Sequence, residues 1–443
     1  MSSLKDLASL IMIPSLVKDG RLDTVKPLGN SIIHPDATGN NDGTDGSTPA
    51  EGNFTFSRGT NLSATRVNAS QLIEKGRENL LLQSNQFDTT WTTGATLTSG
   101  QSGYNGNNAW KFASSSGGQT GVQQSVSFSN IHTFSVYAKA GSVDFIKLFV
   151  VQSGTNRTCV IDLSDGSIAN DNSVSASSPA ASVTSLANGW YRIEMPTNAN
   201  SATFVRIRPQ LSEGDDNLSV GDFIYIQDTQ VEQSLVATPY IETGASTAQA
   251  GILENTPRLD YSGGATCPSL LLEPSRTNVV TTSEYVFATD YVTGNWTGTI
   301  TTNTNETLSP EGFYNATKFV KAGASDRVYF HNSQPDGAYT GSIYLKAASG
   351  SENTTIEISI RRFGGGGGSA SKLVTITNEW QRFDVSASNL TGGTTTAMYI
   401  ADFSSQGSAT QFYSYGMQIE AAAYPTSYIP TYGVSQTRSQ EAF

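Results

Sequence analysis

The chain contains two copies of one sequence unit, and this repeat limits its possible folds more than any other feature. Gln230–Ile241 aligns without gaps with Gln418–Ile429, and Gln, Glu, Thr, Tyr and Ile recur at the same places. Three further matches keep the same order along the chain: Asn188–Arg192 with Asn378–Arg382, Ser135–Ala140 with Ser342–Ala347, and Arg77–Leu80 with Arg276–Val279. Preserved order with unequal spacing is typical of two copies of one domain that have diverged by loop insertions.

Within each copy, apolar and polar residues alternate with a period of two, which predicts short strands separated by turns. Turn signals include Asp165-Gly166 and Asn188-Gly189. No helical pattern lies between the strands, so a parallel α/β fold is excluded and antiparallel sheets are expected. We therefore predict an all-β fold of two tandem jelly-roll sandwiches. The clearest strands are 133–139, 145–151, 204–208, 223–227, 356–360 and 412–417.

Composition excludes several classes of protein. Only 14% of the residues are charged, against a usual value of about 25%, which argues against coiled coils. The net charge of −12 repels nucleic acid, so we expect no nucleic-acid partner. No stretch approaches the roughly 18 apolar residues of a membrane span, and we expect no membrane insertion.

The N-terminal segment, residues 1–35, is predicted to begin with a short helix. Ser3 is placed to cap it, and Leu4, Leu7, Ala8 and Ile11 fall on one face. No small-residue cleavage site follows the apolar run, so we do not expect a secretory signal peptide. Such a helix is too short to be stable alone, and it either packs on its own domain or docks on another protein. The docking hypothesis uses Leu4, Leu7, Ile11 and Ile13.

Residues 36–53 form an apolar-free linker that tethers this peptide, which favours docking. The rest of the chain is then divided into a first module with a leading segment (54–243), a connector (244–275) and a second module (276–443). The connector is expected to pack on the second module, because its run Ser269–Glu273 echoes Leu80–Gln83.

The sequence offers little chemistry. The three histidines are not spaced as metal ligands, and phosphate-binding and nucleophile-elbow motifs are missing. Cys159 and Cys267 cannot form a disulfide framework, and Cys159 is expected to be a free buried thiol. Carboxylates are densest at Asp162, Asp165, Asp215 and Asp216, which lie in turn sequences where solvated side chains are normal. Glycoside hydrolysis requires only two carboxylates at a set separation, and a structural Ca²⁺ requires carbonyls and a few carboxylates. We expect no catalytic residues, no cofactor and no metal site.

Aromatic residues give the best indication of a ligand, because sugars stack on Trp and Tyr. The repeat pairs Trp190 with Trp380 and Trp91 with Trp296, and such shared positions are typical of core anchors. Trp110 differs, since Ala109–Phe112 aligns with Ala316–Phe319 and the second copy has Thr there. Trp110, together with Tyr104 in the preceding loop, is our candidate for sugar contact. The alternation of Trp110 with Phe112 equally favours a place in the core.

Several segments resemble virion appendage proteins of tailed bacteriophages: Ala64–Ser84 (ATRVNASQLIEKGRENLLLQS), Val136–Gly141, Asn188–Arg192, the repeated Gln-x-Glu…Thr-x-Tyr-Ile, and Tyr424–Arg438 (YPTSYIPTYGVSQTR). The resemblance covers about residues 54–438. It implies sandwiches like carbohydrate-binding modules in a non-enzymatic fibre, spike or decoration protein. It also implies an oligomer, for which we favour a trimer, anchored to the particle by the N-terminal segment. The pattern brings no catalytic residues.

Sequence alone therefore predicts a phage virion structural protein, assembled in the host cytoplasm. Its N-terminal peptide would dock on a capsid or tail protein, and its modules would bind host-surface glycans with avidity. Two alternatives remain open at this point. One is a tailspike-type enzyme that degrades the polysaccharide, and the other is a purely architectural decoration or adaptor protein.

Overall fold

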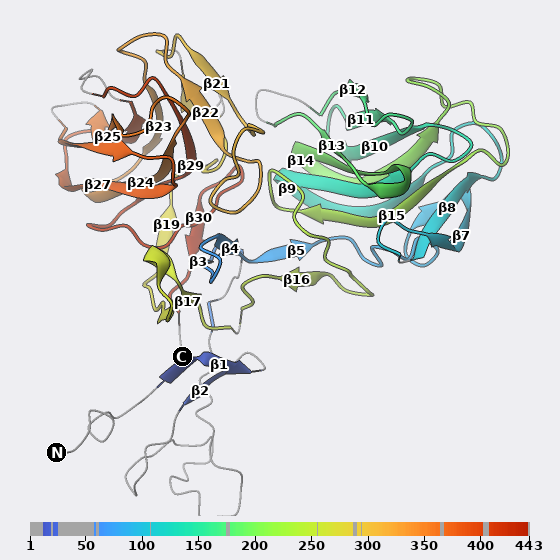
Figure 1. The fold of residues 1–443 in the computed structure, drawn as a ribbon, viewed down its shortest axis with the longest axis horizontal. Helices are drawn as coiled ribbons and strands as arrows, with labels where there is room; N and C mark the ends of the chain where they lie inside the picture. Colours follow the sequence, from blue (N-terminus) through green and yellow to red (C-terminus); the bar gives the residue numbers. More distant parts are fainter. Residues whose placement is uncertain are drawn as a thin grey trace, which may run out of the picture.

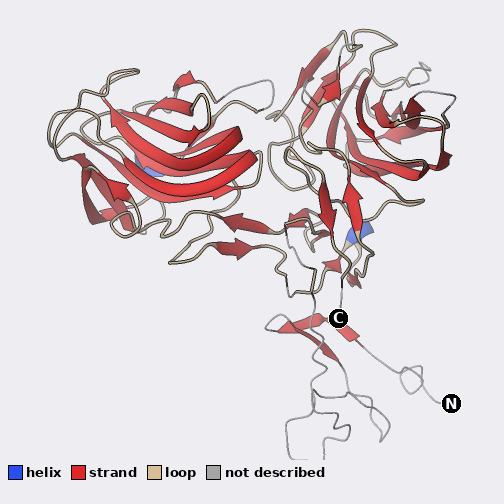
Figure 2. Ribbon diagram, turned by 180° about the vertical axis from the view of Figure 1, so that it is seen from behind, coloured by secondary structure: helices blue, strands red, loops and turns tan. Residues whose placement is uncertain are grey.

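The computed structural model describes residues 57–441, apart from 59–61, 107, 174–177, 255, 287–289, 294, 364–366 and 402–406. In residues 1–56 it describes only the strands β1 (Met12–Lys18) and β2 (Arg21–Thr24), which pair antiparallel. Strands make up nearly all regular structure in the described part (Figure 2), beside two single turns, η1 (Ala187–Gly189) and η2 (Ser262–Gly264). The predicted all-β fold is confirmed.

Module 1, residues 77–243, is one antiparallel assembly with the strand order β12-β11-β10-β14-β9-β15-β8-β7 (Figure 1). β13 joins it beside β14, and β6 joins it beside β9. The strands of this assembly are β6 (Thr92–Thr93), β7 (Ala95–Ser102), β8 (Asn108–Ser114), β9 (Val122–Lys139), β10 (Phe145–Gln152), β11 (Arg157–Asp162), β12 (Ile168–Asp171), β13 (Ser182–Ser185), β14 (Trp190–Gln210) and β15 (Phe223–Glu232).

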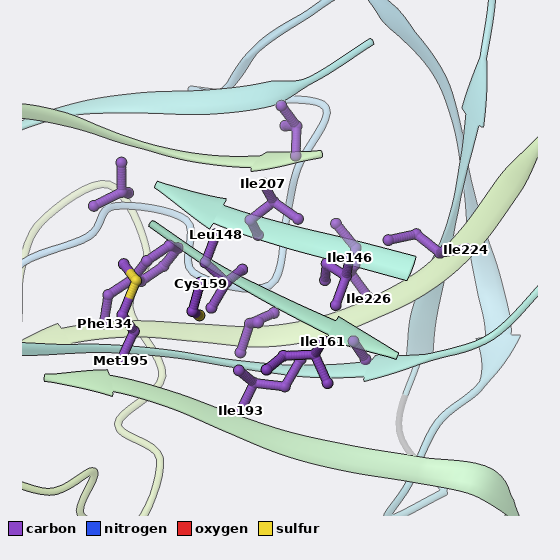
Figure 3. Packing of buried hydrophobic residues seen from close by; sticks show 14 of the residues in the cluster. Phe134, Ile146, Leu148, Cys159, Ile161, Ile193, Met195, Ile207, Ile224 and Ile226 are labelled. Atoms are coloured by element: carbon purple, nitrogen blue, oxygen red, sulfur yellow. The ribbon is translucent and has the colours of Figure 1, made fainter. Parts of the chain in front are cut away.

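Two long strands, β9 and β14, connect the two halves of module 1. Their pairing is irregular between Ala199 and Phe204. On one side of this irregularity β14 pairs with β10, and on the other side β9 pairs with β15. Side chains from both halves meet in one core (Figure 3), which contains Phe134, Ile146, Leu148, Cys159, Ile193, Ile207 and Ile224. Cys159 is a free, buried thiol, as predicted, while Cys267 is free and exposed.

Module 2, residues 276–441, has the same topology, but the two halves are separate five-stranded sheets. Their orders are β20-β23-β28-β25-β26 and β21-β22-β29-β24-β27, so β23 and β24 together correspond to β9, and β27 and β28 to β14. The strands are β20 (Tyr291–Val292), β21 (Thr299–Thr301), β22 (Thr317–Val320), β23 (Val328–Ser333), β24 (Gly337–Ala347), β25 (Thr354–Phe363), β26 (Ser369–Ile376), β27 (Gln381–Leu390), β28 (Thr395–Ile400) and β29 (Gln411–Glu420). The predicted tandem of antiparallel sandwiches is confirmed.

The alternation of residues explains why these segments form strands. In β10, Ile146, Leu148 and Val150 are essentially fully buried, whereas Lys147 between them is partly exposed. Burying each such aliphatic side chain stabilises the fold by about 1.5–3 kcal/mol. All six strands named from the sequence lie within β9, β10, β14, β15, β25 and β29.

The repeated sequence motif closes each module at its end. Asn79, in β5 (Arg77–Asn79), donates from Nδ2 to the carbonyls of Thr229 and Ile241, and its Oδ1 accepts the N–H groups of Leu81 and Val231. Asn278, in β19 (Arg276–Asn278), does the same to the corresponding groups of module 2. One buried amide thus satisfies four backbone groups in each copy.

The repeated Gln and Glu have the same structural purpose. Gln230 Oε1 accepts the N–H of Ile241 at 2.7 Å, and Gln418 Oε1 accepts that of Ile429 at 2.7 Å. The buried carboxylates of Glu232 and Glu420 each accept the backbone N–H and the hydroxyl of a threonine six residues later. The strongest motif of the sequence therefore holds the fold together and is not itself a ligand site.

The leading segment of module 1 packs on module 2. Its strands β3 (Thr65–Val67) and β4 (Ile73–Lys75) form a hairpin, and the N–H of Ile73 donates to the carbonyl of Pro310. The sequence pattern groups this segment with module 1, because its partners lie far along the chain: Thr65 donates to the carbonyl of Tyr428, and the N–H of Val67 donates to Asp260. Figure 1 shows β3 and β4 beside the base of module 2.

The connector contacts both modules. Its strand β16 (Ala248–Ala250) pairs with β5 of module 1. Only the later part of the connector packs on module 2, as expected from the sequence. That part contains the hairpin β17 (Leu259–Asp260) and β18 (Ser269–Leu270). There the fully buried Arg258 forms salt bridges with Glu273 and Glu441. β30 (Gln436–Arg438) then pairs with β19.

The predicted N-terminal helix lies mostly outside the described residues. Leu4, Leu7 and Ile11 belong to residues 1–11, and the linker 36–53 is likewise outside the described part. Ile13, the fourth proposed docking residue, lies in strand β1. The prediction of an anchor therefore remains a prediction.

A cluster of charged side chains is buried where β4 meets module 2. Lys75 Nζ lies 2.6 Å from Glu284 Oε1 and 2.7 Å from Glu311 Oε1, and all three side chains are buried. Lys75 Nζ also donates to the hydroxyls of Tyr432 (2.6 Å) and Tyr415 (3.3 Å). Burial alone would lower the pKa of Lys75, but the two carboxylates raise it above its usual value.

We predict that Lys75→Met destabilises the protein by about 3–5 kcal/mol at pH 7.5, because it leaves two buried carboxylates without a counter-charge. Burial raises the pKa of Glu284, so this carboxyl takes up a proton as the pH falls. The deficit should therefore shrink at pH 5. Urea unfolding at both pH values checks this, with Lys372→Met on the exposed face of β26 as the control. Equal stabilities of the Lys75→Met variant and the wild type would contradict it.

Candidate functional site

Module 1 contains a cavity of about 400 Å³ at one end of the sandwich, within the range of about 300–1,000 Å³ of small-molecule sites. We call it the module-1 cavity. Its lining residues are Asn85, Gln86, Ser99, Asn108, Trp110, Asp228, Tyr240 and Glu242.

Five parts of module 1 position these side chains, and the fifth, β15, carries Asp228. Asn85 and Gln86 follow β5, and Ser99 lies in β7. Asn108 and Trp110 alternate with the buried Ala109 in β8. Tyr240 and Glu242 come from the segment that the repeated Gln230 and Glu232 clamp to the end of the module. The Tyr240 hydroxyl is hydrogen-bonded to Ser84 Oγ at 2.5 Å, which fixes its ring at the cavity wall.

Asp228 reaches the cavity because β15 contains a bulge. The register between β15 and β9 shifts between Gln227 and Gln230, and Asp228 adopts a left-handed conformation with φ of 47°. Bulges of this kind redirect side chains near functional sites. Module 2 has the same bulge, and there the equivalent residue is Gly416, with φ of 64°. A strained position that holds glycine in one copy and a carboxylate in the other is typical of a functional residue.

Asp228 is 97% buried as a residue, and the hydrogen-bond donors to its carboxylate among the described residues are neutral. It accepts hydrogen bonds from the Tyr104 hydroxyl at 3.0 Å and from Gln227 Nε2 at 3.3 Å. Burial raises the pKa of Asp228 to about 6, the charge of Glu242 adds to this, and the hydrogen bonds from Tyr104 and Gln227 act against it. At neutral pH Asp228 is therefore a buried anion at the wall of a cavity.

The two aromatic residues singled out from the sequence are both at this site, although Trp110 presents no open ring face. Trp110 is only 6% exposed, belongs to the core, and packs edge-on against Phe87. Its indole N–H donates to the carbonyl of Asn85 at 2.9 Å. Trp110 thus lines the cavity while its ring is held in the core, as its alternation with Phe112 equally indicated.

Tyr104 covers an aromatic cluster next to the cavity. Its ring stacks on Tyr137 at a centroid distance of 3.9 Å and contacts Trp190 edge-on at 6.4 Å. Because its hydroxyl donates to Asp228, Tyr104 positions the carboxylate rather than lining the cavity itself. Burial raises the pKa of Tyr104, so it remains a hydrogen-bond donor.

Trp91, Trp190 and Trp296 pack in or against buried clusters, as their pairing in the repeat predicts, whereas Trp380 remains partly exposed. Trp91 and Trp190 are buried in module 1, and Trp296 packs against the core of module 2. Trp380 is partly buried against the cluster of Ile73, Tyr415 and Tyr428. The turn carboxylates Asp162, Asp165 and Asp215 each accept the N–H of the residue two positions later, which is the ordinary structural behaviour of such turns.

The lining of the module-1 cavity suits a polyhydroxylated ligand. Asp228 and Glu242 accept hydrogen bonds, Asn85, Gln86 and Asn108 both donate and accept, and Trp110 and Tyr240 supply ring edges. Among the described residues, no group of three or more His, Cys, Asp or Glu is placed to hold a metal ion. No helix in the described part is long and apolar enough to cross a membrane.

Two other surfaces carry candidate ligand groups. On β10 and β14, the Phe149 ring lies beneath Lys147, Arg206 and Arg208, whose charged groups are 5.0–5.9 Å from its centroid. Between the modules, a cavity of about 730 Å³ has a largely apolar lining that includes Val236, Tyr285 and Tyr314. Its lining contains one carboxylate, Glu194, whereas the module-1 cavity has two, Asp228 and Glu242.

Comparisons with known proteins give matches in structure only. No family model matches the sequence, and no curated protein does. Among solved structures, the chain is similar to the tandem CBM22-1–CBM22-2 domains of Xyn10C from Paenibacillus barcinonensis, with 11% identity, a TM-score of 0.27, and coverage of 82% of this chain and 100% of that chain.

Two further structures are similar to parts of the chain. The tandem CBM51 modules of a family 98 glycoside hydrolase from Streptococcus pneumoniae match with 12% identity and a TM-score of 0.18, over 71% of this chain and 84% of that chain. Tailspike protein 4 of bacteriophage CBA120 matches with 13% identity and a TM-score of 0.24, over 32% of this chain and 21% of that chain. At such low similarity, the function of this chain rests on its own residues.

We predict that Asp228→Asn becomes increasingly more stable than the wild type as the pH rises from 4 to 7. The folded-state pKa of about 6 lies above the unfolded value of about 3.9, so the wild type loses stability across this window by about 2 kcal/mol, and asparagine does not. Urea unfolding of both proteins at pH 4, 5.5 and 7 measures the difference. A difference that does not vary with pH would contradict the burial of an ionised Asp228.

Proposed function

We propose that this chain is a non-enzymatic structural protein of a phage particle that binds host-surface glycans through its module-1 cavity. The single observation that supports glycan binding best is the convergence of two carboxylates, three amides and two aromatic edges in one cavity of suitable size. The phage assignment is supported by the resemblance of residues 54–438 to virion appendage proteins.

In this proposal each lining group has a separate role. Asp228, fixed by Tyr104, and Glu242 accept hydrogen bonds from sugar hydroxyls, and hydrogen bonds to a charged acceptor are about twice as strong as neutral ones. Asn85 and Asn108 contact further hydroxyls, and the edges of Trp110 and Tyr240 cover the apolar part of the ring. A single cavity of this kind binds weakly, so attachment would depend on several copies acting together in an oligomer, for which we favour a trimer.

A glycan array tests the binding directly. We predict that the full chain retains one or more bacterial surface glycans, and that Glu242→Gln or Asn108→Ala weakens this binding at least tenfold. Both side chains are exposed at the cavity, so the fold should tolerate the changes. Asp144→Asn, an exposed carboxylate outside the cavity, is the control. Binding that is unaffected by both cavity variants would contradict the assignment of the site.

The alternative with a specific observation in its favour is a polysaccharide-degrading enzyme. Two carboxylates line the cavity, and the pKa of Asp228, raised to about 6, is that of a general acid in glycoside hydrolysis. Incubating the chain with the glycans it binds and measuring reducing ends separates the two functions. Our proposal expects no release; release that Asp228→Asn abolishes would establish the enzyme instead.

The N-terminal segment supplies the particle attachment in this proposal. We predict that deleting residues 1–20 leaves both modules folded, because their cores are built entirely from residues after position 80, and removes the protein from assembled particles. Thermal unfolding of the purified variant tests the first part, and its abundance in purified particles tests the second. Normal incorporation of the truncated protein would overturn the docking hypothesis.

A further inference from the structure

The counterpart of the module-1 cavity in module 2 is filled by an ammonium group of this chain. The repeat places Glu284 where module 1 has Asn85, Asn315 where it has Asn108, and Tyr428 where it has Tyr240. The hydroxyls of Tyr240 and Tyr428 bind equivalent serines, Ser84 and Ser283, at 2.5 and 2.6 Å, which confirms the correspondence in three dimensions.

These three module 2 residues all belong to the cluster around Lys75. Glu284 Oε1 contacts Lys75 Nζ at 2.6 Å, and the Tyr428 hydroxyl donates to the same oxygen at 3.0 Å. Asn315 Nδ2 donates to Glu311 Oε2 at 2.9 Å, and Glu311 Oε1 contacts Lys75 at 2.7 Å. The end of the sandwich in module 2 is thus an ammonium site with two carboxylates, completed by β4 of the leading segment.

Module 1 has Asn85 in place of Glu284, and its cavity has two carboxylates at other positions, Asp228 and Glu242. The cation beside the connector hairpin β17–β18, Arg258, binds Glu273 and Glu441 instead. Among the ion pairs between described residues, none includes Asp228 or Glu242. The cavity therefore presents two anionic groups where module 2 neutralises its anions with a lysine.

We propose that the module-1 cavity recognises an amino sugar with a free, protonated amino group, which takes the place that Lys75 Nζ has in module 2. This inference rests on the proposed glycan-binding function and names the class of sugar. Asp228 and Glu242 would be the counter-charges of the ammonium group, and Asn85, Gln86 and Asn108 would bind the remaining hydroxyls.

The lining favours a sugar over a lysine side chain of another protein. In module 2 the strand that carries Lys75 also contributes an apolar side chain, Ile73, which packs against Tyr415 and Tyr428. The module-1 cavity offers amides and a serine hydroxyl around its carboxylates, and the aliphatic stem of a lysine would leave these groups without partners. The hydroxyls of an amino sugar satisfy them.

Matched tetramers of glucosamine and of N-acetylglucosamine test the inference, because only the first carries free amino groups. Isothermal titration of the full chain at pH 6.5, where most of the Asp228 carboxyl is ionised because its pKa is about 6, and at 150 mM salt should give at least tenfold tighter binding of the glucosamine tetramer. Asp228→Asn and Glu242→Gln should each reduce this preference at least threefold. Asp144→Asn should preserve it, which separates the cavity from general attraction of cations to a chain of net charge −12.

The outcomes distinguish this inference from the proposed function. Equal binding of the two tetramers, or a preference unchanged in both cavity variants, overturns the amino-sugar assignment and leaves glycan binding in place. Binding of an acidic polysaccharide that is lost in Arg206→Ala also overturns it and points to the cationic groups around Phe149. Binding of a lysine-rich peptide in preference to the glucosamine tetramer would replace the sugar by a protein partner. Binding of no glycan at all would remove the proposed function as well.

Discussion

The buried ammonium group of Lys75 is the interaction on which the arrangement of this molecule depends. It comes from the leading segment of one module and neutralises two carboxylates at the end of the other. A buried ion pair contributes little net stability compared with an apolar core, but separating its partners is costly. If the hairpin β3–β4 left module 2, Glu284 and Glu311 would lose their counter-charge and remain as unpaired anions. Module 1 is therefore bound to module 2 through the segment that precedes it.

The same interaction explains why two copies of one domain are not equivalent. The repeated Asn, Gln and Glu close both modules in the same way, since their hydrogen bonds are duplicated almost atom for atom. Apart from these shared hydrogen bonds the modules differ. Lys75 fills the end of module 2, whereas module 1 has a cavity there. The β15 bulge of module 1 carries Asp228, and the equivalent bulge of module 2 carries Gly416. Divergence after duplication has thus left one copy closed and structural and the other open.

Much of the fold follows from the sequence alone, because alternation of apolar residues decides which segments are strands and the repeat decides how often the domain occurs. The sequence pattern groups the leading segment with module 1, because Lys75 in a short polar strand gives no sign that it is buried by groups more than 200 positions away. The free thiol of Cys159 and the core positions of Trp91 and Trp190 were predictable from pattern and pairing.

The candidate site was only half predictable. Trp110 was found because one copy lacks it, yet the same comparison shows Asp228 against Gly416, and this difference is the stronger signal once the bulge is known. Which way Asp228 points depends on the local twist of β15, which no period-two pattern encodes. A crystal structure of the chain with a bound glycan would test most directly the central claim that the module-1 cavity binds the sugar. We predict a sugar in the cavity bounded by Trp110, Asp228 and Tyr240; a sugar bound instead on the sheet around Phe149 would contradict this account.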